Sequence, residues 1–129
     1  MARTASGRPT SPTTDSTTAR GRRAEQLAQH HLESLGLVIT ARNVRVGRDE
    51  LDLVGWDGAV LVVVEVRSAR AGAMVDPAES LTRAKRARLR GATARYAQSV
   101  GAREARIDFV AVIDDRVEHI PNAIDFTET

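Results

Sequence analysis

The chain has 129 residues, 42% of them hydrophobic, a formal net charge of +2 and no cysteine. This length suits one compact domain with a core of its own, and the absence of cysteine excludes disulfide bonds and thiolate metal sites. No apolar run is as long as a membrane span and no apolar leader follows the first arginines, so we expect a cytoplasmic protein without membrane contact.

The basic residues are almost all arginine. Of nineteen Lys and Arg residues, Lys85 is the single lysine, and the sequence pI is about 9.9. Such a balance is compatible with a polyanionic partner. A general preference for Arg, Ala and Val along the whole chain is the other explanation, so the placement of the arginines matters more than their number.

The first nineteen residues are rich in Ser, Thr and Pro, and no large apolar side chain follows Met1. Because such a segment cannot build a core, we expect residues 1–19 to be a disordered tail and residues 20–129 to form the folded domain. The next segment predicts an amphipathic helix over Arg22–Leu35, ended by Gly36. Its apolar stripe consists of Ala24, Leu27, Ala28, His31 and Leu35.

Three strands are expected after this helix. Their sequences span residues 37–46, 50–56 and 59–69, with a turn at 47–49 between the first two. Asp57-Gly58 predicts a tight hairpin between the second and third strands, because both residues tolerate positive φ.

A second helix and another hairpin complete the predicted fold. Pro77 suits the first turn of a helix that we expect over about residues 77–99. Strands over 105–113 and 116–120 then form a hairpin around residues 114–115. The fold class is therefore α/β, with the element order α-β-β-β-α-β-β.

Charged side chains gather on one face of the first predicted hairpin. With a two-residue turn at 57–58, Asp52 lies opposite Val63. Glu50 then faces Glu65, and Asp52 and Glu65 become diagonal neighbours with Cβ atoms roughly 7–8 Å apart. This face is shared by Glu50, Asp52, Glu65 and Arg67. The opposite face carries an apolar set that fixes the register, namely Leu51, Leu53, Val62, Val64 and Val66.

Three adjacent carboxylates repel one another, so this face requires a cation. Mg²⁺ or Mn²⁺ binds carboxylate and carbonyl oxygens together with water and substrate phosphate, and therefore matches a site without His or Cys. The alternative is a surface ion-pair network in which Arg45, Arg48 and Arg67 neutralise the acids. These residues alone leave both explanations open.

The second predicted helix carries basic residues at spacings of three and four. Arg83, Arg86 and Arg90 form this stripe, and Lys85 lies beside it. It can follow phosphates independently of base sequence, and the scarcity of aromatic residues favours duplex or branched DNA over single strands. Arg45 on the first strand is a further candidate for contact with DNA. The alternative is an arginine-rich helix face that only contacts solvent.

Linked motifs run along the chain in the order "GRRAEQLAQHHLESLG", "ITARNVR", "GRDELDLV" with "VVVEVRSAR", and "ARIDFVAV" with "VEHIPNAI". In this order they resemble the uncharacterised family UPF0102, also called the YraN family. The hairpin motif is similar to that family's "GEiDlI … FVEVKtR" signature. The resemblance covers about Gly21–Ile124.

Proteins of this family are similar to archaeal Holliday-junction resolvases and other nucleases of the PD-(D/E)xK type. The resemblance implies a restriction-endonuclease-like mixed β-sheet flanked by helices. It implies that Asp52, Glu65 and the carbonyl of Val66 bind Mg²⁺, and that Glu25 approaches the metal from the first helix. A homodimer is a further implication, because resolvases of this kind cut junctions with two-fold symmetry.

Arg67 stands where the family has a lysine. Arginine can stabilise charge on a phosphate but cannot take up a proton, so the role of base passes to Glu50 or to solvent held by the metal. The sequence thus favours a metal-dependent endonuclease with Asp52 and Glu65 as metal ligands, supported by Glu25 and Glu50, in which Arg67 braces the scissile phosphate. The alternative is a catalytically weak or inactive nucleic-acid-binding protein with a nuclease-like fold.

Overall fold

The structure is a computed structural model that describes residues 12–70, 72 and 75–126. Its elements are α1 (Pro12–Ser34), β1 (Val38–Val46), β2 (Asp49–Asp57), β3 (Val60–Ala69), α2 (Pro77–Ser80), α3 (Arg83–Val100), β4 (Glu104–Ile113) and β5 (Arg116–Ile124). Apart from the short helix α2, this is the predicted order. No helix in the described part of the chain is long and apolar enough to cross a membrane.

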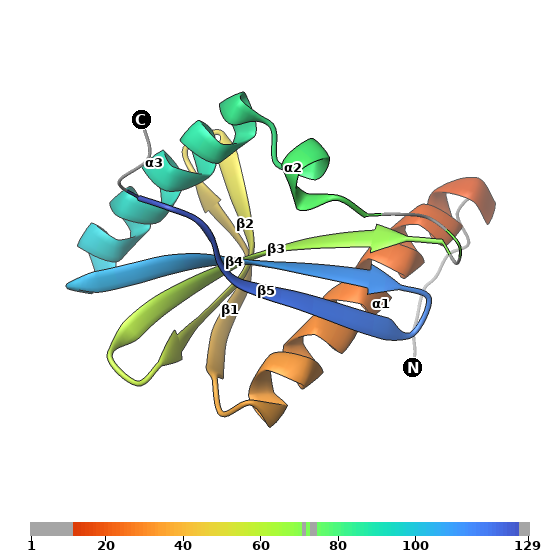
Figure 1. The fold of residues 1–129 in the computed structure, drawn as a ribbon, viewed down its shortest axis with the longest axis horizontal. Helices are drawn as coiled ribbons and strands as arrows, with labels where there is room; N and C mark the ends of the chain where they lie inside the picture. Colours follow the sequence, from red (N-terminus) through yellow and green to blue (C-terminus); the bar gives the residue numbers. More distant parts are fainter. Residues whose placement is uncertain (1–11, 71, 73–74, 127–129) are drawn as a thin grey trace, which may run out of the picture.

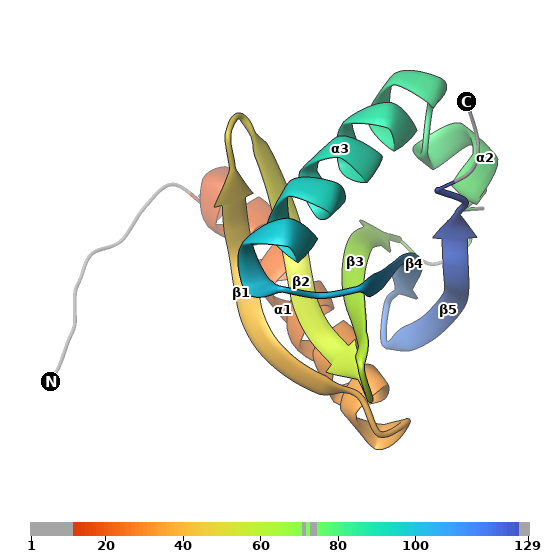
Figure 2. The same cartoon turned by 90° about the vertical axis from the view of Figure 1, so that its left-hand side faces the viewer.

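The five strands form one mixed sheet in the order β1-β2-β3-β4-β5 (Figure 1). Neighbouring strands are antiparallel except β3 and β4, which are parallel. A parallel pair needs a long crossover, and the segment with α2 and α3 provides it. Helix α1 packs on one face of the sheet and α3 on the other (Figure 2). The predicted mixed sheet flanked by helices is therefore confirmed.

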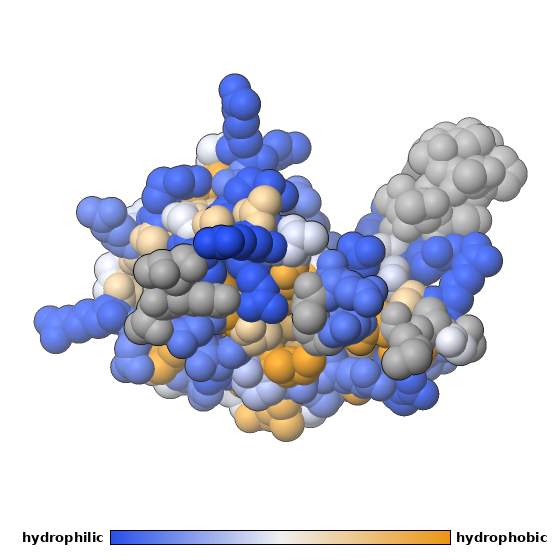
Figure 3. Space-filling model, turned by 45° about the horizontal axis from the view of Figure 1, so that its top comes forward, coloured by the Kyte–Doolittle hydropathy of each residue, from blue (hydrophilic) through white to orange (hydrophobic). Residues whose placement is uncertain are grey.

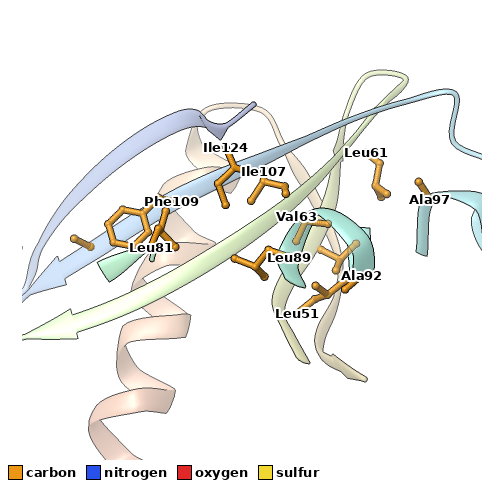
Figure 4. Packing of buried hydrophobic residues seen from close by; sticks show 12 residues of the cluster. Leu51, Leu61, Val63, Leu81, Leu89, Ala92, Ala97, Ile107, Phe109 and Ile124 are labelled. Atoms are coloured by element: carbon orange, nitrogen blue, oxygen red, sulfur yellow. The ribbon is translucent and has the colours of Figure 1, made fainter. Parts of the chain in front are cut away.

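Two apolar clusters hold the helices on the sheet. Figure 4 shows the cluster under α3, where Leu89 and Ala92 pack near strand residues such as Val63. The cluster under α1 consists of Ala24, Ala28, Leu32, Leu37, Leu53, Val62, Val64, Val110 and Val112. Strand β3 contributes to both clusters, because a central strand covered on two faces needs apolar side chains on each side.

Helix α1 is longer than predicted. It begins at Pro12 instead of Arg22, because proline fits the first helical turn and no second proline interrupts the segment. Residues 12–19, predicted to belong to a disordered tail, are therefore helical. Residues 1–11 lie outside the described residues.

The single helix expected over residues 77–99 is wrong, since α2 and α3 are separate helices. Thr82 lies between them with extended backbone angles, and its Oγ1 accepts a hydrogen bond from the backbone N–H of Lys85 at 3.2 Å. Threonine at this position caps a new helix start, which competes with continuing the old one.

The β2–β3 hairpin turns one residue later than predicted. Asp57 pairs with Val60, so the turn is formed by residues 58–59, and Gly58 supplies the positive φ of 61°. Val63 consequently pairs with Val54 instead of Asp52. The pairing has moved by two residues relative to the prediction, and a two-residue shift does not exchange the faces of a strand.

One part of the predicted alternation is wrong. Leu51 and Leu53 belong to different clusters, Leu51 under α3 and Leu53 under α1. The register pairs Arg42 with Leu53 and Val44 with Leu51, which leaves Asn43 between them with a φ of 51°. The break in the alternation of β2 therefore lies opposite a left-handed residue of β1, a conformation that asparagine accepts more readily than most residues.

Strand β5 extends to Ile124, beyond the predicted 116–120. Its register with β4 is irregular between Ile107 and Phe109. Pro121 is compatible with this longer strand because β5 is an edge strand, where a missing N–H need not break the ladder.

Gly55 is required where β1 and β2 approach each other closely. A Cβ at this position would lie 2.5 Å from the carbonyl oxygen of Val38 and 3.0 Å from Cα of Ile39. Both contacts are with backbone, so Gly55→Ala must separate the strands and should lower the free energy of unfolding by about 2–3 kcal/mol in urea unfolding. Gly21→Ala is the matched control, because nothing lies within 4 Å of its Cβ. It should stabilise α1 by about 0.5–1 kcal/mol. Equal effects of the two substitutions would contradict the close approach.

Candidate functional site

The candidate site lies where the sheet divides. Pairing between β2 and β3 runs from Asp57 and Val60 to Leu53 and Val64. Beyond this point β2 continues beside β1, and β3 continues beside β4 as far as Ala69. The two halves of the sheet diverge there (Figure 2). Asp52 and Glu65 are the first residues past the division. Their backbone groups form no β2–β3 ladder pair, so this position is open between the two strands.

Asp52 and Glu65 form a hydrogen-bonded carboxyl pair at this division. Asp52 Oδ2 also accepts a hydrogen bond from the backbone N–H of Val66 at 2.9 Å. Burial raises the pKa of Asp52 to about 7, and the charge of Glu65, its hydrogen bond and the charge of Glu25 contribute to the rise, whereas the Val66 N–H opposes it. Asp52 therefore releases its proton only near neutral pH when no metal ion is bound.

Glu25 and Glu50 lie on either side of this pair. Burial raises the pKa of Glu25, a hydrogen bond from the Asn43 side chain opposes this, and Glu50 adds a smaller upward contribution. Glu50 is exposed, and its backbone lies opposite Arg45 in the β1–β2 ladder. The four predicted acids are thus electrostatic neighbours, with Asp52 and Glu65 at the centre.

Lys85 reaches the acidic pair from α3. Its Nζ lies 2.6 Å from Glu65 Oε2, and the side chains of Lys85 and Glu65 are 32% and 10% exposed. The sequence predicts Lys85 only as a DNA contact of the basic helix, so its contact with Glu65 is a new finding. Lys85 stands out in the sequence as a single lysine beside eighteen arginines. No local sequence pattern, however, predicts that this residue of α3 contacts β3.

A hollow of about 310 Å³ joins these groups. It is lined by Arg48, Asp49, Glu50, Asp52, Glu65, Lys85, Arg88 and Leu89. Arg67 is exposed and lines a separate hollow beside it, together with Asp76 and Glu79. The structure therefore brings together three of the five predicted catalytic residues in one hollow, whereas Glu25 belongs to α1 and Arg67 lines the other hollow.

The predicted basic stripe on α3 is only partly exposed. Arg83 is exposed, whereas Arg86 and Arg90 are half-buried, and Arg86 Nε donates to the carbonyl of Leu81 at 2.8 Å. Arg88 and Arg95 extend from the same helix towards Asp49, with N–O distances of 3.8 and 3.5 Å. Figure 3 shows a mainly hydrophilic surface on this side of the molecule.

Two carboxylates form the donor set that a divalent ion would meet at the division. No group of three or more His, Cys, Asp or Glu side chains that could hold one metal occurs among the residues described. Mg²⁺ is commonly held by one or two carboxylates, with waters and substrate phosphates in the remaining positions. Asp52 and Glu65 fit such an ion, because a cation would offset the burial and the charge of Glu65 that raise the pKa of Asp52.

Comparison with known proteins finds relatives of a single family. The model of the family described as "Uncharacterised protein family UPF0102" matches residues 24–112. A UPF0102 protein of Beutenbergia cavernae is 44% identical over 107 residues, covering 78% of this chain and 91% of that protein. A UPF0102 protein of Anaeromyxobacter dehalogenans is 43% identical over 117 residues, covering 86% and 87%. The UPF0102 protein sce2912 of Sorangium cellulosum is 40% identical over 115 residues, covering 85% and 80%.

Proposed function

This chain belongs to the uncharacterised protein family UPF0102, and we propose that it is a metal-dependent endonuclease that binds duplex or branched DNA. In this proposal Asp52 and Glu65 hold Mg²⁺ or Mn²⁺. The phosphodiester bond of the bound strand is hydrolysed at the division between β2 and β3.

One observation carries the proposal. Asp52 and Glu65 lie in contact in a position largely shielded from solvent, and the pKa of Asp52 is raised to about 7 by burial and by Glu65. Folding alone does not favour a carboxylate at position 52, since an asparagine would still accept the Val66 hydrogen bond without burying a charge. Perturbed pairs of this kind cluster at functional sites.

The residues around the hollow supply what phosphodiester hydrolysis needs. Asp52 and Glu65 would hold the divalent ion, which would supply Lewis-acid stabilisation of the phosphoryl oxygen and a more acidic water. Arg48 and Arg88 line the same hollow and offer donors to phosphate oxygens. Glu50, which is exposed there, accepts a proton from the attacking water as its oxygen bonds to phosphorus. The bond from phosphorus to the leaving oxygen breaks, and that oxygen takes a proton from solvent.

The test uses the full chain with four-way, flap and linear duplex DNA in Mn²⁺. We expect cleavage of at least one substrate, its loss with EDTA, and a rate at least about 10²-fold lower in Asp52→Asn. Glu104→Gln is the matched control, because Glu104 is an exposed acid at the start of β4. It should cleave like the wild type.

The main alternative is a DNA-binding protein without turnover. Binding of these DNAs by wild type and Asp52→Asn alike, with no cleavage in Mn²⁺, would support it and end the nuclease proposal. Cleavage that appears only in Arg67→Lys would identify an enzyme inactivated at position 67.

A further inference from the structure

The single lysine of the chain contacts the acid that β3 contributes to the site. The Lys85 Nζ to Glu65 Oε2 distance of 2.6 Å is that of a charge-assisted hydrogen bond. Thr82 caps α3 three residues earlier and accepts the Lys85 N–H. The cap fixes the first turn of α3, so the lysine stem starts from an ordered position above the hollow.

Position 67 does not provide this cation. Arg67 lies two residues after Glu65 on β3, yet it lines the neighbouring hollow formed with α2. Lys85, in contrast, lines the hollow that contains Glu50, Asp52 and Glu65. The positive group in contact with the carboxyl pair therefore comes from a different element than the strand motif suggests.

The Lys85 ammonium has donors to spare. It is a compact charge with three donors, so it can donate to a carboxylate and to a second oxygen at the same time. Glu65 occupies one donor. The other two N–H groups of the ammonium lie at the hollow that Arg48 and Arg88 also line. A phosphate oxygen in this hollow would accept a hydrogen bond from one of them.

We propose that Lys85 supplies from α3 the ammonium group of the nuclease-like site: it positions the Glu65 carboxylate and donates to a non-bridging oxygen of the scissile phosphate. This inference rests on the proposed function. It explains how the site operates with arginine at position 67, because the lysine is provided across the helix–sheet interface.

The test has one measurement without DNA and one with it. Removing a positive charge next to a metal ligand removes repulsion, so Lys85→Met should bind Mn²⁺ about 10-fold more tightly in calorimetry. With saturating Mn²⁺ and DNA, the same variant should cleave about 10–100-fold more slowly. Introducing Arg67→Lys into Lys85→Met should restore little of this loss, since position 67 faces the other hollow.

Arg103→Met is the control for a lost charge, because Arg103 is exposed and lies outside the hollow. It should leave Mn²⁺ affinity and cleavage within about 2-fold of the wild type. A wild type that cleaves while Lys85→Met cleaves equally fast would overturn the role of Lys85 and spare the proposed function. A wild type that binds Mn²⁺ without cleaving would end the proposed function. In that case the Mn²⁺ affinity of Lys85→Met still tests the contact with Glu65, and an affinity equal to that of the wild type would overturn the role of Lys85.

Discussion

Replacing Asp108 with alanine is expected to lower the free energy of unfolding by about 3–5 kcal/mol. Asp108 is fully buried on β4. Its Oδ1 accepts from Arg106 Nε at 3.0 Å and from the backbone N–H of Asn122 at 2.9 Å, and its Oδ2 lies 2.8 Å from His119 Nε2. Alanine would leave a half-buried guanidinium, a mostly buried imidazole and a backbone N–H without their shared partner.

Urea unfolding at pH 7 measures this loss, with Glu104→Ala as the control on the same strand. Glu104 is exposed, so its removal should change stability by no more than about 0.5 kcal/mol. Because Asp108 anchors Asn122 in the irregular part of β5, the Asp108→Ala variant should also lose protection of β5 amides in hydrogen exchange. A loss below about 1 kcal/mol would mean that these groups find other partners.

Much of this fold can be predicted from the sequence because its signals are local. The apolar run of β3 predicts a strand covered on both faces, and the glycine at position 58 predicts a hairpin. The predicted turn is misplaced by one residue, since Asp57-Gly58 and Gly58-Ala59 both offer a glycine with positive φ. Local preference cannot choose between them, whereas the packing of the strands does.

The sequence predicts the meeting of Asp52 and Glu65 in spite of this error. The pairing differs by two residues, which preserves the face of each side chain and brings the two acids closer. Leu51 is misassigned for a different reason, because the alternation of β2 breaks between Leu51 and Leu53, opposite the left-handed Asn43. The sequence assigns Lys85 only to DNA, since its distance from Glu65 depends on how α3 packs against the sheet. Such a contact leaves no periodic signal in either segment.

Replacing Asp52 with asparagine should stabilise the metal-free protein above neutral pH by ~4 kcal/mol. The pKa of Asp52 is about 7 in the folded state against an ordinary value of 3.8. Between these values the folded state holds a proton that the unfolded state releases, so the stability of the wild type falls as pH rises through this window. One pKa unit corresponds to about 1.4 kcal/mol. An amide carries no charge and still offers an oxygen to the Val66 N–H.

The measurement is urea unfolding in EDTA at several pH values from about 4 to 8. The wild type and Asp52→Asn should agree at the acidic end and separate as pH rises, because the variant lacks the titrating carboxyl group. Asp114→Asn, in an exposed turn, should instead follow the wild type. Parallel curves of unfolding free energy against pH for wild type and Asp52→Asn would show that ionisation of Asp52 does not destabilise the folded state.

Addition of metal to the same two proteins tests whether a cation binds at Asp52 and offsets the cost of its ionisation. Mn²⁺ at about 100 times its Kd should return about 2.7 kcal/mol to the wild type. It should return nothing to Asp52→Asn, because the amide cannot replace the second carboxylate that the ion requires. Equal stabilisation of both proteins by Mn²⁺ would place the bound ion away from the division between β2 and β3.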